Sequence, residues 1–259
     1  MPTEALFQKA ARITERIRRY NAGKAAARTL HERVPGRRIV TVCEAVHRFF
    51  VENPREPEAP VLLIEGDVVV DGVLDGAWLD RQLSGLPRNR RPRGAIIAGD
   101  LAVGDAIVDD DALELAVLGN LACEYLHSER GRIEVRGHAR VAHGIHGGRD
   151  GGFLRIRGRL DCPYLVAGDH DMPRSAAGDF IRIEAGDDDA REDVAIDDRR
   201  GGGRGWDGRH PAEPAACLPP AALDGNGRFS AERFFRIVRR GENPFAAGRQ
   251  GRPALTLVA

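Results

Sequence analysis

The chain has 259 residues, enough for one large domain or two small ones with a buried core. Its 39 basic and 39 acidic residues cancel, so net charge gives no general attraction to nucleic acid or to a membrane surface. No run approaches the roughly 18 apolar residues that a spanning helix needs, and the charged start lacks the apolar core of a secretory signal. We therefore expect a soluble, cytoplasmic protein that binds neither membranes nor nucleic acid.

The cancelling charges are distributed unevenly along the chain. Residues 1–38 hold ten basic and three acidic residues, a net of +7, whereas residues 61–171 hold 13 and 18, a net of −5. Within residues 3–20, apolar side chains recur at helical spacing. The rest of that helix carries Arg12, Arg16, Arg18 and Arg19. We expect these arginines to form a solvated helix face, with a patch for an anionic partner as the alternative.

Two shorter helices are predicted to follow. The first covers residues 25–34 and ends at Pro35-Gly36. The second opens at a capping box formed by Thr41 and Glu44 and continues to about residue 51. A proline-rich joint comes next. The sequence thus predicts a helical N-terminal region over residues 1–60.

The middle of the chain repeats one phrase five times, as VLLIEGDVVV, GAIIAGDLAV, ELAVLGNLAC, RIEVRGHARV and FLRIRGRLDC. The phrases centre on Gly66, Gly99, Gly119, Gly137 and Gly158, at intervals of 33, 20, 18 and 21 residues, and the first interval contains an insertion. Two and four residues on either side of each glycine, nearly every side chain is aliphatic. Alternation with period two is typical of a strand with one buried face.

A period near 20 residues fits one coil of three short strands and three bends, at about 3.3 Å per residue. Stacked coils would bury ladders of aliphatic side chains, and each glycine would relieve crowding at a bend. We therefore predict a mainly β fold, a parallel β-solenoid of about five coils over residues 61–175. A β-sandwich needs no common register, and a leucine-rich repeat would show an asparagine ladder and a helical limb.

The four cysteines, Cys43, Cys123, Cys162 and Cys217, lack the paired spacing of a metal site. Cys123 and Cys162 occupy the same slot of coils that are two apart. That separation is about 10 Å, which exceeds the roughly 7 Å allowed between the Cα atoms of a disulfide. We expect both to be free, buried thiols.

Two decorations of the repeat hold candidate functional residues. The insertion is expected to project as a loop, and its arginines could contact a phosphate, a carboxylate or a protein partner, with a solvated loop as the alternative. These arginines are Arg88, Arg90, Arg91 and Arg93. The second decoration is an acidic, histidine-containing bend after each glycine. A divalent-metal site there would use His143, His146, Asp169, His170 and Asp171. Aspartate is also an ordinary turn residue.

The chain after the repeat is predicted to be more open. Residues 180–186 are expected to add a strand, and residues 176–218 have the charged, glycine-rich composition of a linker. A final region, residues 219–259, contains a helix over residues 231–240 that Ser230 caps and Gly241 ends. The preceding DGNGRF stretch fails the calcium-loop pattern.

The phrase GDVVVDG and its echoes GDLAVGD and GNLAC resemble the G-D-L-x-V coils of bacterial polymer-forming β-helix proteins, of which the bactofilins are the best known. The resemblance covers roughly residues 61–171. It implies a right-handed parallel β-helix that acts as a scaffold, and it implies no catalytic residues. Bactofilin filaments stack through exposed solenoid ends. Here the helices predicted at 42–51 and 231–240 are expected to cover those ends, which leaves a monomer, a small oligomer or a filament open.

These observations favour a non-enzymatic scaffold that associates with a protein partner or with itself and needs no cofactor. A weaker analogy connects it with accessory or immunity-type components of bacterial conflict systems. The alternative is a sugar- or polysaccharide-active β-helix enzyme that uses the acidic bend for acid–base chemistry. Its candidate residues are Asp109, Asp111, His146, Asp169 and His170. A hexapeptide-type acyltransferase ranks last because the strict six-residue spacing is missing.

Overall fold

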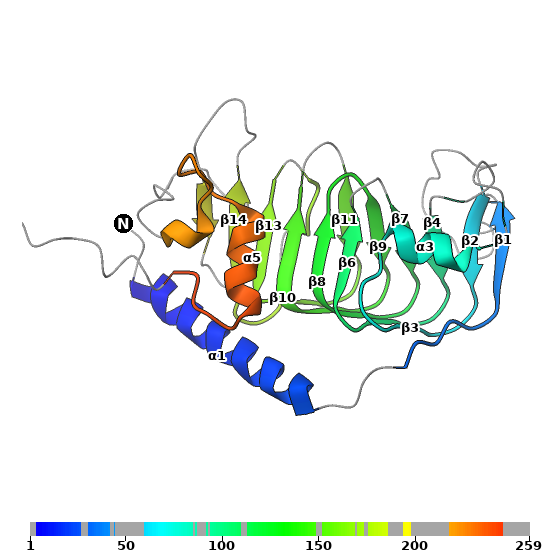
Figure 1. Ribbon diagram of the computed structural model, residues 1–259, viewed down its shortest axis with the longest axis horizontal. Coiled ribbons are helices and arrows are strands. Elements are labelled where there is room, and N and C mark those ends of the chain that lie inside the picture. Colours follow the sequence, from blue (N-terminus) through cyan, green and yellow to red (C-terminus); the bar gives the residue numbers. More distant parts are fainter. Residues whose placement is uncertain are drawn as a thin grey trace, which may run out of the picture.

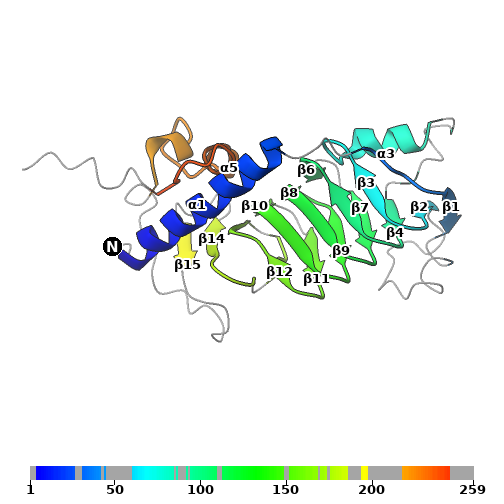
Figure 2. The same cartoon turned by 90° about the horizontal axis from the view of Figure 1, so that it is seen from below.

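The computed structural model describes residues 4–26, 31–41, 44, 60–84, 86, 92, 94–109, 113–148, 152–168, 170–173, 176–185, 194–197 and 218–245. Its centre is a parallel β-solenoid (Figure 1). Helix α1 (Glu4–Ala26) lies along the solenoid, and helix α5 (Ala231–Arg239) lies beside α1 (Figure 2). The predicted mainly β solenoid, with a helix before it and a helix after it in the sequence, is confirmed.

The first wall of the solenoid is a six-stranded sheet. Each repeat contributes one strand to it, and these five strands pair in parallel: β2 (Pro60–Ile64), β4 (Gly94–Ile97), β7 (Glu114–Val117), β9 (Arg132–Val135) and β11 (Phe153–Ile156). Like positions of the copies are register partners, as in the series Leu62, Ala95, Leu115, Ile133 and Leu154. The five copies thus make about four turns of solenoid.

The second and third walls belong to one bent, nine-stranded sheet. The second wall follows the glycine bend and consists of β3 (Val68–Val70), β5 (Leu101–Val103), the first halves of β8 (Leu121–Ser128) and β10 (Ala139–Gly147), and β12 (Leu160–Asp161). The third wall contains β6 (Ala106–Asp109), the second halves of β8 and β10, β13 (Tyr164–Ala167) and β14 (Ile181–Ala185). The β10 register shifts between Val141 and Gly144, where the two walls meet. Each coil therefore has three sides, as its period predicted.

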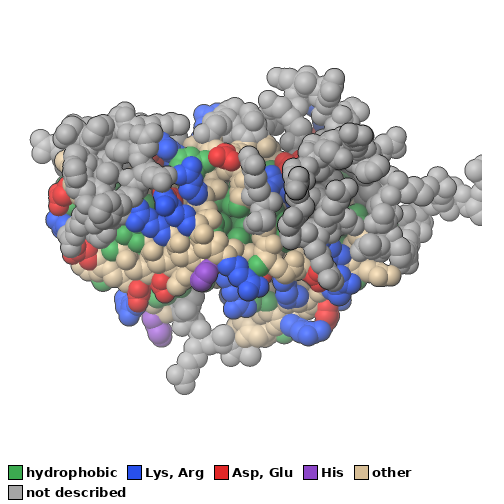
Figure 3. Space-filling view, turned by 180° about the vertical axis from the view of Figure 1, so that it is seen from behind, with side chains coloured by type: hydrophobic (Ala, Val, Ile, Leu, Met, Phe, Trp, Pro, Cys, Tyr) green, Lys and Arg blue, Asp and Glu red, His purple; other side chains and the backbone are tan. Residues whose placement is uncertain are grey.

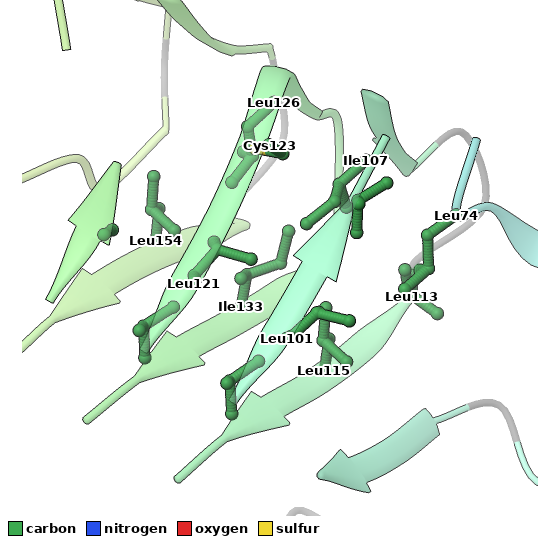
Figure 4. Close-up of a cluster of buried hydrophobic side chains, with 14 of the residues drawn as sticks. Leu74, Leu101, Ile107, Leu113, Leu115, Leu121, Cys123, Leu126, Ile133 and Leu154 are labelled. Carbon is green, nitrogen blue, oxygen red and sulfur yellow. The ribbon is translucent and has the colours of Figure 1, made fainter. Parts of the chain in front are cut away.

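Aliphatic side chains fill the space between the walls. Ile64, Ile97, Val117 and Val135, each two residues before a repeat glycine, are all 0 % exposed. Figure 4 shows leucine and isoleucine side chains from different walls meeting in this interior. Burying one such side chain contributes about 1.5–3 kcal/mol, so a stack of this length holds the register firmly. A one-residue slip would turn the stack outward.

The glycine bends leave no room for a side chain. A Cβ on Gly99, Gly119, Gly137 or Gly158 would lie at most 2.7 Å from a backbone atom of the preceding repeat glycine. The side chain after each glycine accepts a hydrogen bond from the backbone N–H one coil further on. This ladder runs from Asp67 to Asp100 (2.9 Å), Asn120 (2.7 Å), His138 (2.9 Å) and Arg159 (2.8 Å). Coil stacking therefore explains both recurring features of the phrase, the glycine and the polar side chain that usually follows it.

Residues 31–34 are extended, contrary to the helix predicted over 25–34. The backbone of Arg33 exchanges hydrogen bonds with Val69, because the outermost strand of the bent sheet needs a partner. Residues 37–41 form strand β1 (Arg37–Thr41), which pairs with β2. Of the helix predicted over 42–51, the structure describes Glu44, whose N–H donates to Thr41 Oγ1 at 3.1 Å as a capping box requires.

The insertion and the expected linker also contain regular structure. Within the insertion, α3 (Gly76–Gln82) forms where a plain loop was predicted. Asp75 caps it by accepting from the N–H of Trp78 at 2.7 Å, and Trp78 and Leu79 are buried against the solenoid core. In the linker, β15 (Val194–Asp197) pairs with β14. The strand predicted over 180–186 is confirmed as β14.

An antiparallel strand stands at each end of the solenoid. β1 pairs antiparallel with β2 at one end, and β15 pairs antiparallel with β14 at the other. Helix α5 lies over the third wall, where Phe235 packs against Tyr125 with 4.8 Å between ring centroids. The prediction that α5 covers an end was therefore wrong: its strongly apolar side matches the outer surface of the wall.

Cys123 and Cys162 are free and buried, as predicted. Burial raises the pKa of the Cys162 thiol to about 12, and it raises the pKa of the Cys123 thiol still further. Neither sulfur is therefore available as a thiolate in the folded protein.

The buried thiols are tested with the Cys43→Ser/Cys217→Ser variant, which leaves only Cys123 and Cys162. We expect a thiol reagent to titrate neither cysteine in buffer and both after unfolding in guanidinium. Rapid reaction in buffer would contradict the core position of the two sulfurs.

The glycine bend is tested by comparing Gly137→Ala with Gly23→Ala. The first places a Cβ 2.5 Å from the Gly119 carbonyl oxygen, and we expect overpacking to lower the free energy of unfolding by about 1–3 kcal/mol. The second lies in α1 with nothing within 4 Å of the new Cβ, so helix propensity should raise stability by up to about 1 kcal/mol. Equal effects in urea unfolding would disprove the steric account.

Candidate functional site

Helix α1 joins the basic start of the chain to the acidic repeat. Its apolar side chains, Leu6, Ala10, Ile13 and Ile17, are buried against the third wall and α5. Its basic side chains meet acids along the solenoid: Arg12 with Asp179 (3.2 Å), Arg16 with Asp161 (3.6 Å), and Lys24 with Glu124. The solvated arginine face that the sequence predicted is thus partly an internal contact.

Helix α5 is held against both α1 and the third wall. Arg18 Nε donates to the Gly241 carbonyl at 2.7 Å, and Asn21 Nδ2 donates to the Arg239 carbonyl at 3.0 Å, so α1 satisfies the carbonyls at the end of α5. Gly144 has φ of +147°, and a Cβ there would lie 2.5 Å from Phe235 Cε1. This glycine lets α5 approach the sheet.

A groove of about 840 Å³ lies between α1 and the outer side of the second wall. It adjoins a second hollow of about 440 Å³ that follows the glycine bend. The two hollows share the floor residues Ala102, Ala122 and Arg140. Tyr20 and Lys24 of α1 line one side, and the ladder residues up to Arg159 line the other. The groove is the larger of these two hollows.

A cluster of polar side chains closes the groove beneath α1. Glu124 is only 5 % exposed and pairs with Lys24, whose Nζ also donates to the Gly104 carbonyl at 2.9 Å. Burial, and then the Glu124 carboxylate, raises the pKa of Tyr20. His143 is 3 % exposed, and its Nε2 lies 2.9 Å from Asn21 Oδ1.

The charge state of His143 follows from its surroundings. Burial, and then the positive charges of Arg239 and Lys24, lower the pKa of its imidazole to about 4, and the Asp105 carboxylate opposes them with a smaller effect. At neutral pH a neutral imidazole therefore sits beside the Glu124 carboxylate, with 4.0 Å between His143 Nδ1 and Glu124 Oε2. The cluster fixes α1 and is too enclosed to receive a substrate.

Asp109, a candidate acid–base residue, is used structurally. It is 1 % exposed, and its carboxylate accepts hydrogen bonds from Leu113 N–H (2.6 Å), Ser128 Oγ (3.2 Å) and Gly131 N–H. These contacts tie three successive parts of the bend together. No oxygen of this carboxylate faces a substrate cavity among the described residues.

The four predicted metal ligands that the structure describes do not form one site. His143 lies under α1, whereas His146 stacks on His127 at 4.6 Å between ring centroids and faces Phe235 of α5. His170 is buried at the third bend, and neither ring nitrogen has a hydrogen-bond partner among the described residues. Asp171 is exposed and pairs through its backbone with β11. Nowhere in the described ranges are three His, Cys, Asp or Glu side chains placed to hold a metal.

Several predicted site residues cannot be placed. Arg88, Arg90, Arg91, Arg93, Asp111 and Asp169 lie outside the described residues. The groove itself was missed by the sequence reasoning. Its signals were the alanines at two successive outward positions, Ala102 and Ala122, and the opposite charges of α1 and the repeat.

Searches with protein-family models, among curated proteins and among solved structures found no match to this chain. Among the described residues, no helix is both long and apolar enough to cross a membrane. What the protein does must therefore be argued from its own geometry.

The enclosed position of His143 predicts an acid-sensitive fold. Its pKa in the folded state, about 4, lies below its ordinary value of 6.5, so the unfolded chain binds a proton first as pH falls. Stability should therefore be lost between about pH 6.5 and 4, by on the order of 3 kcal/mol from this group.

Urea unfolding between pH 7 and 4 checks this expectation. His143→Gln should lose less stability across that range than the native protein, whereas His31→Gln, which alters an exposed histidine, should keep the native pH dependence. Identical slopes for all three proteins would rule out His143 as the source.

Proposed function

We propose that the protein is a non-enzymatic scaffold that binds protein partners through the outer surface of its solenoid. The observation that carries the proposal is the antiparallel strand at each end, β1 and β15. Because those strands interrupt the parallel stacking, the regular surface left for association is the sides of the solenoid. The resemblance of the repeat to bactofilin coils supports the scaffold role, and the end strands favour a discrete particle over a filament.

The outer side of the first wall is a suitable contact surface. Its last two strands present Arg132 and Arg155, whose guanidinium groups lie 4.6 and 5.6 Å from the centre of the Phe153 ring. Beside them, Arg157 bonds Glu134 at 3.0 Å. Figure 3 looks onto this side of the molecule, where Lys and Arg side chains stand among hydrophobic ones. Arginine and aromatic side chains are enriched at protein interfaces.

The loop arginines Arg88, Arg90, Arg91 and Arg93 remain a second predicted contact. We place the scaffold in the cytoplasm, and an accessory or immunity-type role is compatible with a particle of this kind. The sugar-active alternative loses support for two reasons. The Asp109 carboxylate already accepts hydrogen bonds from within the bend, and His146 is packed against α5. Neither group is presented to a saccharide.

Sedimentation velocity of the purified protein, with and without EDTA, tests the proposal. We expect one discrete species whose size does not depend on protein concentration in the micromolar range or on the chelator. Filaments would contradict the argument from the end strands, and dissociation by EDTA would reveal a metal in the assembly. Release of reducing sugar from polysaccharides, abolished by Asp109→Asn without loss of fold, would overturn the non-enzymatic role.

A further inference from the structure

We propose that the groove between α1 and the second wall binds an extended acidic peptide segment of a partner protein. The inference rests on the proposed scaffold function and assigns it a second surface, separate from the arginines of the first wall. Three properties of the groove carry the inference: its floor, its uncompensated charges and the absence of features that other polyanions need.

The floor of the groove is flat and apolar. Ala102 and Ala122 are register partners on adjacent coils and point outward, so nothing longer than a methyl group stands on the sheet there. Their backbone groups lie within the sheet, which leaves no free edge for an added strand. From the coil of Ala102 to the coil of Arg159 the groove spans three steps, about 14 Å at ~4.8 Å per step. A peptide of four or five extended residues covers that length.

Three of the acids around the groove are paired with basic side chains, and a fourth accepts hydrogen bonds. Glu124 pairs with Lys24, Asp105 pairs with Arg239, and Asp161 pairs with Arg16. The Asp100 carboxylate accepts hydrogen bonds from both the backbone and the side-chain amide of Asn120. These carboxylates therefore do not cancel the charges of other cations that line the groove.

Two arginines remain at one end of the floor. Arg140 and Arg159 are exposed and have no ion-pair partner among the residues that the structure describes. Arg140 stands in the floor row after Ala122, and Arg159 stands at the bend of the next coil. A guanidinium binds a carboxylate through two parallel hydrogen bonds. Two neighbouring guanidinium groups beside an alanine floor fit acidic side chains separated by small apolar ones.

Other polyanions fit this groove less well. A single nucleic-acid strand is bound by stacking platforms and by several phosphate contacts. Tyr20 is the one tyrosine, phenylalanine or tryptophan among the described residues that line the groove, and it already packs against His143 with 5.8 Å between ring centroids, so a series of stacking platforms is missing there. A polysaccharide would lack an aromatic platform for the same reason.

Fluorescence anisotropy with a labelled eight-residue peptide of alternating aspartate and alanine tests the site. We expect binding to the native protein that weakens as salt is added. Arg140→Ser/Arg159→Ser should weaken it at least tenfold. The matched control, Arg132→Ser/Arg155→Ser, removes two arginines from the outer side of the first wall and should change affinity by less than twofold. Thermal melting of each variant checks that the fold is kept.

A second variant tests the floor without removing charge. Ala122 is exposed, so Ala122→Phe fills the groove while leaving the core untouched, and it should also weaken the peptide at least tenfold. Native affinity in this variant would overturn the proposal. So would loss of binding in the first-wall control with native binding in Arg140→Ser/Arg159→Ser.

Competition experiments decide the class of ligand. An oligonucleotide or an oligogalacturonate that displaces the peptide at lower concentration than unlabelled peptide would overturn the peptide assignment. Citrate that competes as well as the peptide would reduce the site to a small-anion site and also overturn it. No binding of the peptide at all would refute the groove proposal, whereas the scaffold proposal fails separately, by filaments or by turnover.

Discussion

The close approach of successive backbones at the glycine bends is the constraint on which the rest of the structure depends. Each repeat glycine lies against the backbone of the glycine one coil earlier, and the next side chain bonds the following coil. This contact fixes the register of all three walls. In a coil that slipped by one residue, a side chain would have to fit where the glycine lies, and the hydrogen bonds between successive bends would be lost. Inward positions are then committed to the apolar core, and only outward positions are free to vary. Every candidate binding feature lies at an outward position.

The sequence predicted the features that recur in every coil. It did not predict elements that depend on a single contact with a distant part of the chain. The inward ladder through Leu115 and Ile133, the bend glycines and the free thiols followed from period two and a constant register. Strand β1 did not, because five residues beginning with two arginines carry no strand signal until the edge of β2 is beside them. Helix α3 was missed for the same reason. Trp78 is a core residue only because the folded coil provides apolar side chains for it to pack against.

The groove could not be read from the sequence for a related reason. Ala102 and Ala122 look like weak strand residues until α1 stands beside them as a wall. The docking of α1 in turn combines two forces. Burial of Ile13 and Ile17 supplies most of the stabilisation, whereas each half-exposed ion pair contributes only about 0–1 kcal/mol. The pairs at Arg12 and Lys24 lie about three turns apart along α1 and so help to set its direction. The uneven charge along the sequence is thus explained in part by ion pairs between basic side chains of α1 and acidic side chains along the solenoid.

The last strands also determine where the solenoid stops. β14 continues the third wall, but it places Arg182 beside Leu165 and Glu184 beside Ala167, on the side that faces the core in every earlier coil. Arg182 bonds Glu184 and the Pro173 carbonyl, so this charged pair replaces the aliphatic ladder. A further coil stacked on this end would have to bury the pair away from water, at a cost that apolar contacts on the same side could not offset. Two independent features at this end therefore oppose the stacking of a further coil, the antiparallel β15 and the reversed polarity of β14. Both features fit the proposed scaffold, which would associate through the sides of the solenoid and not by end-to-end stacking.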